Sequence, residues 1–288
     1  MTKKIKAYQV LNLPPLFFIL FLGIYLLFSA IKTSIFDYKT NQFIFTSNIF
    51  RLLNDSYLLA SLKTTISYVS ITVIATLIIG LFIAEFIHHF IKSNNIKNLI
   101  TLLLILPIAT APVAIGVMGR LMFTPEYGVI NVMLKSLNII NEEIKWFSEP
   151  LTALLAIVIM DVWEWTPFVT LVMLSGLFSI PKEIYEAAKL DGASTGKIFR
   201  FIDLEYLKPL LLVVTIFRIA DEFRVFDIIM IMTKGGPGFS TETLAVYLYR
   251  VSFKYFDLSY GSFLAILILI VMILISFVLT KLLWKRGS

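Results

Sequence analysis

The sequence contains no cysteine, which excludes a disulfide framework, a thiolate metal site and a cysteine nucleophile. Charged residues are also scarce, at 15% of the 288 residues, whereas hydrophobic residues reach 58% and mean hydropathy is +0.88. A soluble domain is closer to about half apolar and about a quarter charged. The composition therefore predicts an integral membrane protein.

The formal net charge of +6 does not indicate a nucleic-acid partner. Proteins that bind nucleic acid gather their lysines and arginines in one patch or stripe. Here the basic residues lie in short loops between apolar runs, which is typical of residues that orient a membrane protein.

Six segments are apolar and long enough to cross a bilayer as helices, which takes about 20 residues each. We therefore predict an all-α polytopic membrane protein with one transmembrane domain over residues 1–288. We expect the first span to be retained, because no Ala-x-Ala-like cleavage site follows it. The predicted spans lie near residues 14–32, 62–87, 99–122, 151–176, 209–232 and 260–282.

The distribution of lysine and arginine predicts the orientation. If the N-terminus is inside, the inner segments hold more of these residues than the outer ones, most clearly at the two ends of the chain. Both termini are then cytoplasmic, and so is the polar loop 179–208 between the fourth and fifth spans.

This loop has the pattern of two short helices. Ser179 or Ile180 can cap the first with Pro181 near its first turn, Gly192 fits a left-handed stop, and Ser194 can cap the second. From these residues alone, the loop is either a helix lying on the inner leaflet or a docking surface for another protein.

The segment Glu186, Ala187, Ala188 and Gly192 resembles the EAA motif of ATP-binding-cassette (ABC) importer permeases, most of all in the sugar-importer branch. In that family the loop forms a coupling helix that docks on a separate ATPase, so the resemblance implies that these four residues carry the docking. The motif usually continues with Ile-x-Leu-Pro-x-Leu-x-Pro, and this chain departs from it at the first proline, where Glu205 stands.

The resemblance extends over most of the chain. Residues 106–131 are similar to the third span and the following outer loop, residues 161–168 to the fourth span, and residues 226–243 to the end of the fifth. Their order and spacing together are specific to this branch, and the last of these patterns favours the first of the two permease subunits that such importers usually have. The resemblance implies a type I ABC importer permease fold in the inner membrane and no catalytic centre. It also implies a second permease, two ATPase subunits that bind ATP and magnesium, and an external substrate-binding protein as partners.

Charged residues occur inside the fourth and fifth predicted spans, where each costs at least about 2.5 kcal/mol at a helix centre. They should therefore face protein or a water-filled cavity. Residues 161–168 and 218–227 lie at similar depth in their spans, so we expect these two segments to share one cavity. Arg218 and Glu222 are spaced as an ion pair on one helix.

Aromatic residues accompany these charges, and aromatic faces beside acids suit a sugar or polyol. Of the positions that the resemblance implies, Phe168, Phe223, Arg224 and Asp227 are the strongest candidates for substrate contact. The resemblance to the maltose-type permease implies a pathway formed by Glu164, Trp165, Phe168, Ala220, Phe223, Arg224 and Asp227.

Two alternatives stay open at this point. The excess of acidic residues would suit a cationic solute such as a polyamine. An ion-coupled secondary transporter would use Asp161, Asp221 or Asp227 as a proton or sodium site and would need no ATPase.

Two apparent motifs are rejected. Residues 192–198 resemble a phosphate-binding loop but have three residues between the glycines instead of four, and Ile198 stands where Ser or Thr is needed, so this chain should bind no ATP. His88 and His89 are adjacent, point apart on a helix and have no evident ligand beside them, so we predict no metal site.

Overall fold

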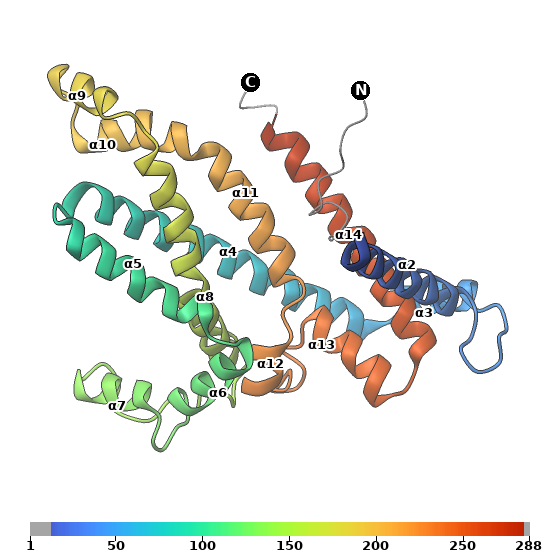
Figure 1. Ribbon diagram of the computed structural model, residues 1–288. Coiled ribbons are helices and arrows are strands. Elements are labelled where there is room, and N and C mark those ends of the chain that lie inside the picture. The colour runs from blue at the N-terminus through green and yellow to red at the C-terminus, as the bar shows by residue number, and fades with distance from the viewer. Residues whose placement is uncertain (1–12, 285–288) are drawn as a thin grey trace, which may run out of the picture. The chain divides into compact units, whose positions relative to one another are not determined.

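The computed structural model describes residues 13–284, and helices form nearly all of this part of the chain (Figure 1). The basic residues at the two ends that support the predicted orientation, Lys3, Lys4, Lys6, Lys285 and Arg286, lie outside the described residues. Contacts divide the chain into two compact units. One contains the residues up to Asp55 together with Leu248–Val271, and the other contains Ser56–Tyr247 and the residues from Met272 on.

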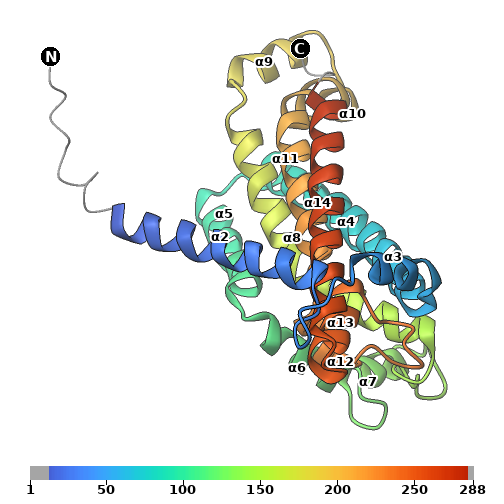
Figure 2. The ribbon, with the colours of Figure 1, turned by 90° about the vertical axis from the view of Figure 1, so that its right-hand side faces the viewer.

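The first unit is built from α2 (Leu13–Ile35), α3 (Phe45–Asn54), the π-helical segment η2 (Arg250–Lys254) and the first part of α14 (Leu258–Trp284). The apolar side chains of α2 are nearly all exposed, which suits contact with lipid; Figure 2 shows this helix in blue. The end of α3 is held to α14, because Arg51 pairs with Asp257 and the Tyr260 hydroxyl donates to Asp55 at 2.8 Å.

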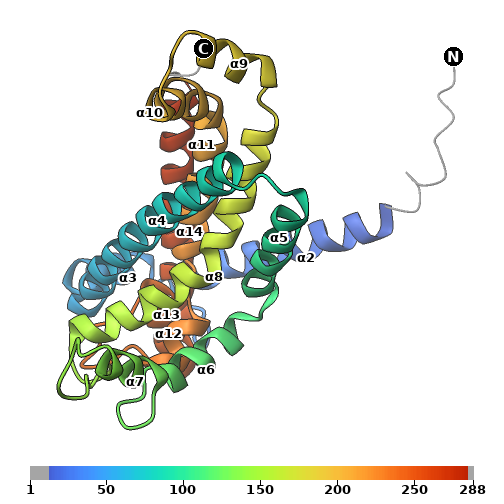
Figure 3. The same ribbon diagram turned by 90° about the vertical axis from the view of Figure 1, so that its left-hand side faces the viewer.

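The second unit is organised around α4 and α8, with α5 and α11 packed against α8 (Figure 3). Gly80 permits the close approach of α4 and α8, because a Cβ atom there would lie 2.7 Å from the Cβ of Val169. The helices of the second unit are α4 (Ser56–Phe90), α5 (Asn94–Ala109), α6 (Pro112–Met122), α7 (Val129–Ser136), α8 (Pro150–Phe178), α9 (Lys182–Leu190), α10 (Thr195–Ile198), the π-helical η1 (Phe199–Asp203), α11 (Leu204–Glu222), α12 (Asp227–Met232) and α13 (Leu244–Tyr249). The last of these, α13, ends within the first unit.

A buried core joins α4, α8 and α11 near the end that carries α9. Ile87, Leu177 and Leu207 are among its fully buried members. Ile184 and Tyr185 of α9 pack against this core from the side. The helix predicted to dock on another protein is therefore anchored directly on the helices of the second unit.

Four of the six predicted spans are single helices long and apolar enough to cross a membrane, namely α2, α4, α8 and α14. The predicted span over residues 99–122 is not one continuous helix, because α5 and α6 meet at an angle of 93°. The cause is local: Pro112 excludes helical geometry at the preceding residue, and Ala111 is extended with ψ of 136°.

The predicted span over residues 209–232 is likewise not one continuous helix. Helix α11 begins at Leu204, follows directly on η1, and ends at Glu222, and α12 begins only at Asp227. Glu205, at the position of the family's proline, pairs with Lys208 on the exposed side of α11, and the helix continues through Pro209.

Candidate functional site

The turn after α9 has the geometry predicted for Gly192, whose φ of +75° is in the left-handed region. Its N–H donates to the carbonyl of Lys189 at 3.0 Å, and the N–H of Ala193 donates to the carbonyl of Ala188 at 2.9 Å. This pair of bonds is the Schellman arrangement that ends a helix sharply. The left-handed stop is thus confirmed.

The predicted cap at the start of α9 is wrong. Pro181 is the N-cap residue, while the Ser179 hydroxyl donates instead to the Gly176 carbonyl at 2.6 Å at the end of α8. Ser194 does take the N-cap position of α10, although its side chain makes no capping bond.

Helix α9 has two distinct faces. Ile184 and Tyr185 contact the core, whereas Glu186 and Ala187 are exposed and Ala188 is half-buried. Leu190 was missed by the sequence analysis, and it is 89% exposed at the end of the helix. It lies four residues after Glu186, so the two side chains share one face. An exposed leucine and an exposed carboxylate therefore lie together on the free face of α9.

A second group of candidate residues surrounds a cavity of about 230 Å³ between α6, α8, the end of α11 and the start of α12. The expectation that residues 161–168 and 218–227 share a cavity is confirmed. The lining consists of Pro112, Asp161, Glu164, Trp165, Asp221, Glu222, Arg224, Val225, Phe226, Asp227 and Ile228.

Arg218 fixes the wall of this cavity from behind. Its side chain is fully buried, its Nη2 donates to Asp161 Oδ1 at 2.8 Å, and it pairs with Glu222. The guanidinium carbon lies 4.6 Å from the centre of the Trp165 ring, and the Tyr68 hydroxyl donates to Asp161 Oδ2 at 2.6 Å. The predicted pair of Arg218 with Glu222 is confirmed, and Asp161 is already bound to an arginine and a tyrosine.

The open side of the cavity is charged. Arg224 is exposed and donates to Asp221 Oδ1 at 3.0 Å from the short break between α11 and α12. Asp227 is also exposed, at the first position of α12. Glu164 is buried in the α8 wall beside the Trp165 ring.

The structure brings four of the seven predicted pathway residues to this cavity, namely Glu164, Trp165, Arg224 and Asp227. Phe168, Ala220 and Phe223 are not part of its lining. Phe168 packs instead beside Trp165 and Phe217, with ring centres 5.9 and 5.2 Å away. Phe223 is buried at the end of α11, and Ala220 is half-buried on that helix.

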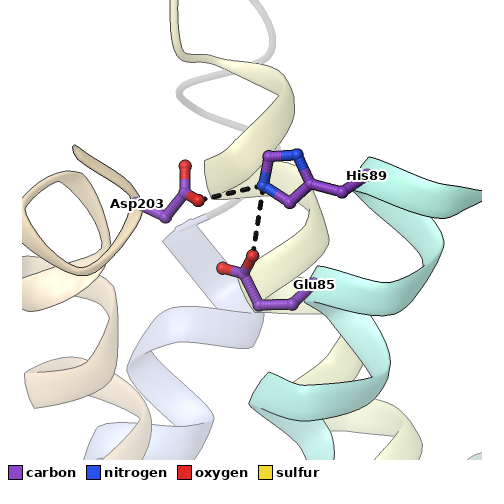
Figure 4. A group of neighbouring side chains, drawn as sticks. All are labelled: Glu85, His89 and Asp203. Carbon is purple, nitrogen blue, oxygen red and sulfur yellow. Dashed lines mark hydrogen bonds and ion pairs between the residues drawn. The ribbon is translucent and has the colours of Figure 1, made fainter. Parts of the chain in front are cut away.

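A third group lies where α4 ends near η1, and Figure 4 shows its three side chains converging. The Nε2 atom of His89 is 2.9 Å from Asp203 Oδ2 and 3.2 Å from Glu85 Oε2. The expectation that no ligand lies beside the histidines is therefore wrong for His89. Glu85 was visible four residues earlier on the same helix face, whereas Asp203 is brought in by the fold.

Tyr185 connects this cluster to α9. Its hydroxyl donates to Asp203 Oδ1 at 2.6 Å. Burial, together with this bond to the carboxylate, raises the pKa of Tyr185 well above its usual range, so the hydroxyl keeps its proton. The coupling helix candidate is thus tied by a hydrogen bond to the segment that leads into α11.

Comparison with known proteins identifies relatives over most of the chain. Residues 76–286 match the family described as "Binding-protein-dependent transport system inner membrane component". The trehalose/maltose transport system permease protein of Thermococcus litoralis is 36% identical over 241 residues, which cover 83% of this chain and 79% of the relative. The arabinooligosaccharides transport system permease protein of Bacillus subtilis is 31% identical over 243 residues, covering 84% and 76%.

Solved structures show the same fold. The chain superposes with a TM-score of 0.84 on a chain of a bacterial ABC transporter involved in the import of the acidic polysaccharide alginate, at 17% identity and with coverage of 99% and 98%. A second alginate ABC transporter, in complex with a periplasmic protein bound to an alginate pentasaccharide, gives a TM-score of 0.82 at 18% identity. At these identities the likeness concerns the fold alone.

Proposed function

Because this chain belongs to the family of binding-protein-dependent transport system inner membrane components, we propose that it is a permease subunit of an ATP-driven importer for a carbohydrate or polyol. It has the type I permease fold of ABC importers and is a membrane transport component, not an enzyme. The observation that carries the substrate class is the cavity in which Trp165 lies beside carboxylates and Arg224.

The chemistry of this cavity fits hydroxylated solutes. The ring of Trp165 offers an apolar face for the CH surface of a sugar, while Asp227 and Glu164 accept hydrogen bonds from hydroxyls and Arg224 donates to them. The relatives' names support the same class, since they refer to trehalose and maltose and to arabinooligosaccharides. Phe168 and Phe223, which were expected to contact substrate, would act here by supporting the wall.

Coupling to ATP is proposed to pass through α9. The surface that docks on an ATPase subunit is formed by Glu186, Ala187, Ala188 and Gly192, together with Leu190. Because α9 is anchored on the core of α4, α8 and α11, a movement of α9 reaches the helices that line the cavity.

Two ATPase subunits bind ATP and magnesium, a second permease completes the pathway, and an external substrate-binding protein delivers the solute. The two permeases then alternate between inward and outward access.

The orientation follows from the docking role. ATP is hydrolysed in the cytoplasm, so α9 is proposed to lie on that side, and the bias of lysine and arginine supports the same side for both termini.

A cationic solute such as a polyamine is the second candidate, and the number of acids around the cavity favours it. Three of these acids are bound to arginine, however: Asp161 and Glu222 to Arg218, and Asp221 to Arg224. The ion-coupled alternative is weaker, because Asp161 is held by Arg218 and Tyr68 and the family works with a separate ATPase.

The test is purification of the chain with its co-expressed partner subunits, reconstitution in proteoliposomes, and a screen for solutes that stimulate ATP hydrolysis with the binding protein present. We expect stimulation by a sugar or polyol. Stimulation by polyamines alone would overturn the substrate class. Transport by this chain without an ATPase would overturn the importer itself.

A further inference from the structure

The cluster of Glu85, His89 and Asp203 has a geometry suited to a metal ion (Figure 4). One ligand atom from each side chain lies within 4.8 Å of the other two. An ion bound at about 2.0–2.2 Å from its ligands separates neighbouring ligand atoms by about 3 Å. The distances of 2.9 and 3.2 Å from His89 Nε2 to the two carboxylates already match this spacing.

The charges of the cluster call for a cation. Asp203 is fully buried and Glu85 is only 14% exposed, so two carboxylates lie largely out of water beside one imidazole. Buried carboxylates are costly unless a counter-charge accompanies them. A protonated His89 supplies one positive charge, whereas a divalent ion supplies two and leaves the imidazole neutral. Among the residues that the structure describes, no lysine or arginine forms an ion pair with either carboxylate.

Two further features prepare the site. Oε1 of Glu85 is buried and has no hydrogen-bond partner within residues 13–284, so this carboxylate has a second oxygen free to bind an ion. Tyr185 donates to Oδ1 of Asp203, which leaves Oδ2 directed at His89. An outer hydrogen bond of this kind orients a ligating carboxylate. His89 is 21% exposed, so an ion can enter from its side.

We propose that Glu85, His89 and Asp203 bind one first-row divalent transition metal ion, Zn²⁺ or Mn²⁺, at the inner end of α4. A mixed set of imidazole and carboxylate ligands suits these ions better than the all-oxygen ligand sets typical of Ca²⁺ and Mg²⁺. The bound ion links α4 to η1, the segment between the coupling helix α9 and α11. It thereby stiffens the base from which α9 projects.

The experiment uses the full chain in its assembled complex, stripped with a chelator and kept free of nucleotide so that the ATPase subunits hold no magnesium nucleotide. Isothermal titration with ZnCl₂ and with MnCl₂, together with elemental analysis after dialysis, measures the ions bound. Because an ATPase can bind metal ions itself, the result is the difference between wild type and variants. We expect one Zn²⁺ or Mn²⁺ per copy of this chain to be lost in His89→Gln and in Asp203→Asn.

Two variants separate ligation from folding. Glu85→Gln keeps the size of a partly exposed side chain and should weaken binding of the ion strongly, and Tyr185→Phe should weaken it by about tenfold or more while the site persists. His88→Gln, next to the site but outside the ligand set, is the matched control and should bind as wild type does. Equal metal content in wild type and in Glu85→Gln, or no ion on the wild-type chain, would overturn the proposal.

The metal site and the importer function fail separately. A complex that shows solute-stimulated ATP hydrolysis but binds no ion at this cluster would leave the importer standing and remove the site. A complex that binds the ion but transports nothing would leave the metal site standing and remove the importer function.

Discussion

Arg218 shows how single residues make a charged cavity tolerable at membrane depth. One guanidinium group, out of contact with water, holds Asp161 of α8 and Glu222 of α11 and lies over the Trp165 ring. Each of these carboxylates would otherwise be buried without a counter-charge, which is expensive in protein and in lipid. Arg218 is therefore a structural residue that holds the wall of the cavity, while Arg224 and Asp227 are exposed at its open side.

Replacing Arg218 by methionine removes one member of this network and leaves two buried carboxylates. We expect the free energy of unfolding to fall by about 3–5 kcal/mol, because breaking a buried ion pair by removing one partner leaves uncompensated charge. Thermal unfolding of the purified complex in detergent measures this as a lower transition temperature. Arg224→Met is the control, because that side chain is 73% exposed and its loss should change stability little. Equal transition temperatures for the two variants would contradict the structural role of Arg218.

Asp227 is expected to act on the solute and not on stability. In Asp227→Asn, a charged acceptor for a sugar hydroxyl is lost, and a hydrogen bond to a charged group contributes about 1.5–3 kcal/mol. The solute concentration that half-maximally stimulates ATP hydrolysis should therefore rise by about tenfold or more. Glu126→Gln, an exposed acid outside the cavity lining, should leave this concentration unchanged. An unaltered concentration in Asp227→Asn would remove Asp227 from the pathway.

Sequence spacing predicted the pair of Arg218 with Glu222 within one helix, but the pair of Glu85 with His89 and the contacts between helices were missed. Arg218 and Glu222 are four residues apart, so their pairing is visible in the sequence, as is that of Glu85 with His89. The partners Tyr68 and Asp161 are 93 residues apart, and His89 and Asp203 are 114 apart. Such contacts depend on which helices pack together, and hydropathy does not specify that.

At the scale of elements, apolar length predicted those helices that are uniformly apolar. This criterion failed where a helix is broken over only a few residues, because hydropathy averaged over a whole span does not reveal so short a break. The bend between α5 and α6 lies at residues 110–111, and the gap between α11 and α12 covers residues 223–226. Both breaks adjoin the cavity, where irregular backbone can be tolerated because it faces protein or water and not lipid.

The pairing of α4 with α8 depends on Gly80. In Gly80→Val, the new side chain would begin 2.7 Å from Val169 Cβ, so the two helices would have to separate. Overpacking of this kind costs about 1–3 kcal/mol, and the transition temperature of the complex should fall accordingly. Gly23→Val in α2, where nothing lies within 4 Å of the new Cβ, is the matched control. The close packing would be refuted if both variants unfolded at the same temperature.

The turn after α9 offers a similar comparison for docking. Valine at Gly192 meets no neighbour, but the residue's φ of +75° is strained for any L-amino acid with a side chain and costs about 1–2 kcal/mol. We expect Gly192→Val to reorient the end of α9 and reduce the amount of ATPase that co-purifies. Gly196→Val, also in open space but in helical geometry, should retain the ATPase. Equal recovery of ATPase with the two variants would count against docking through this turn.

At the scale of the molecule, α8 and α11 connect the candidate docking helix α9 to the candidate solute cavity within the second unit. Leu177 and Leu207 belong to the core on which α9 rests, while Asp161 and Glu222 of the same two helices line the cavity. In the proposed function, a force that an ATPase applies to α9 would therefore act on two helices that also line the cavity. Composition and charge predicted the membrane location, but this connection depends on the packing of α4, α8 and α11.

The lack of cysteine makes the membrane orientation directly testable. Glu126→Cys and Lys182→Cys introduce one thiol each at exposed positions before and after α8, which is the helix between them that is long and apolar enough to cross a membrane. A membrane-impermeant maleimide applied to intact cells should label Glu126→Cys, whose loop lies outside in the proposed orientation. It should label Lys182→Cys only after the membrane is permeabilised, because α9 lies on the cytoplasmic side in the proposed orientation. The wild-type chain, with no thiol, gives the background. Labelling in the opposite order would invert the orientation and exclude docking of a cytoplasmic ATPase on α9. Labelling of both thiols from one side would show that α8 does not cross the membrane.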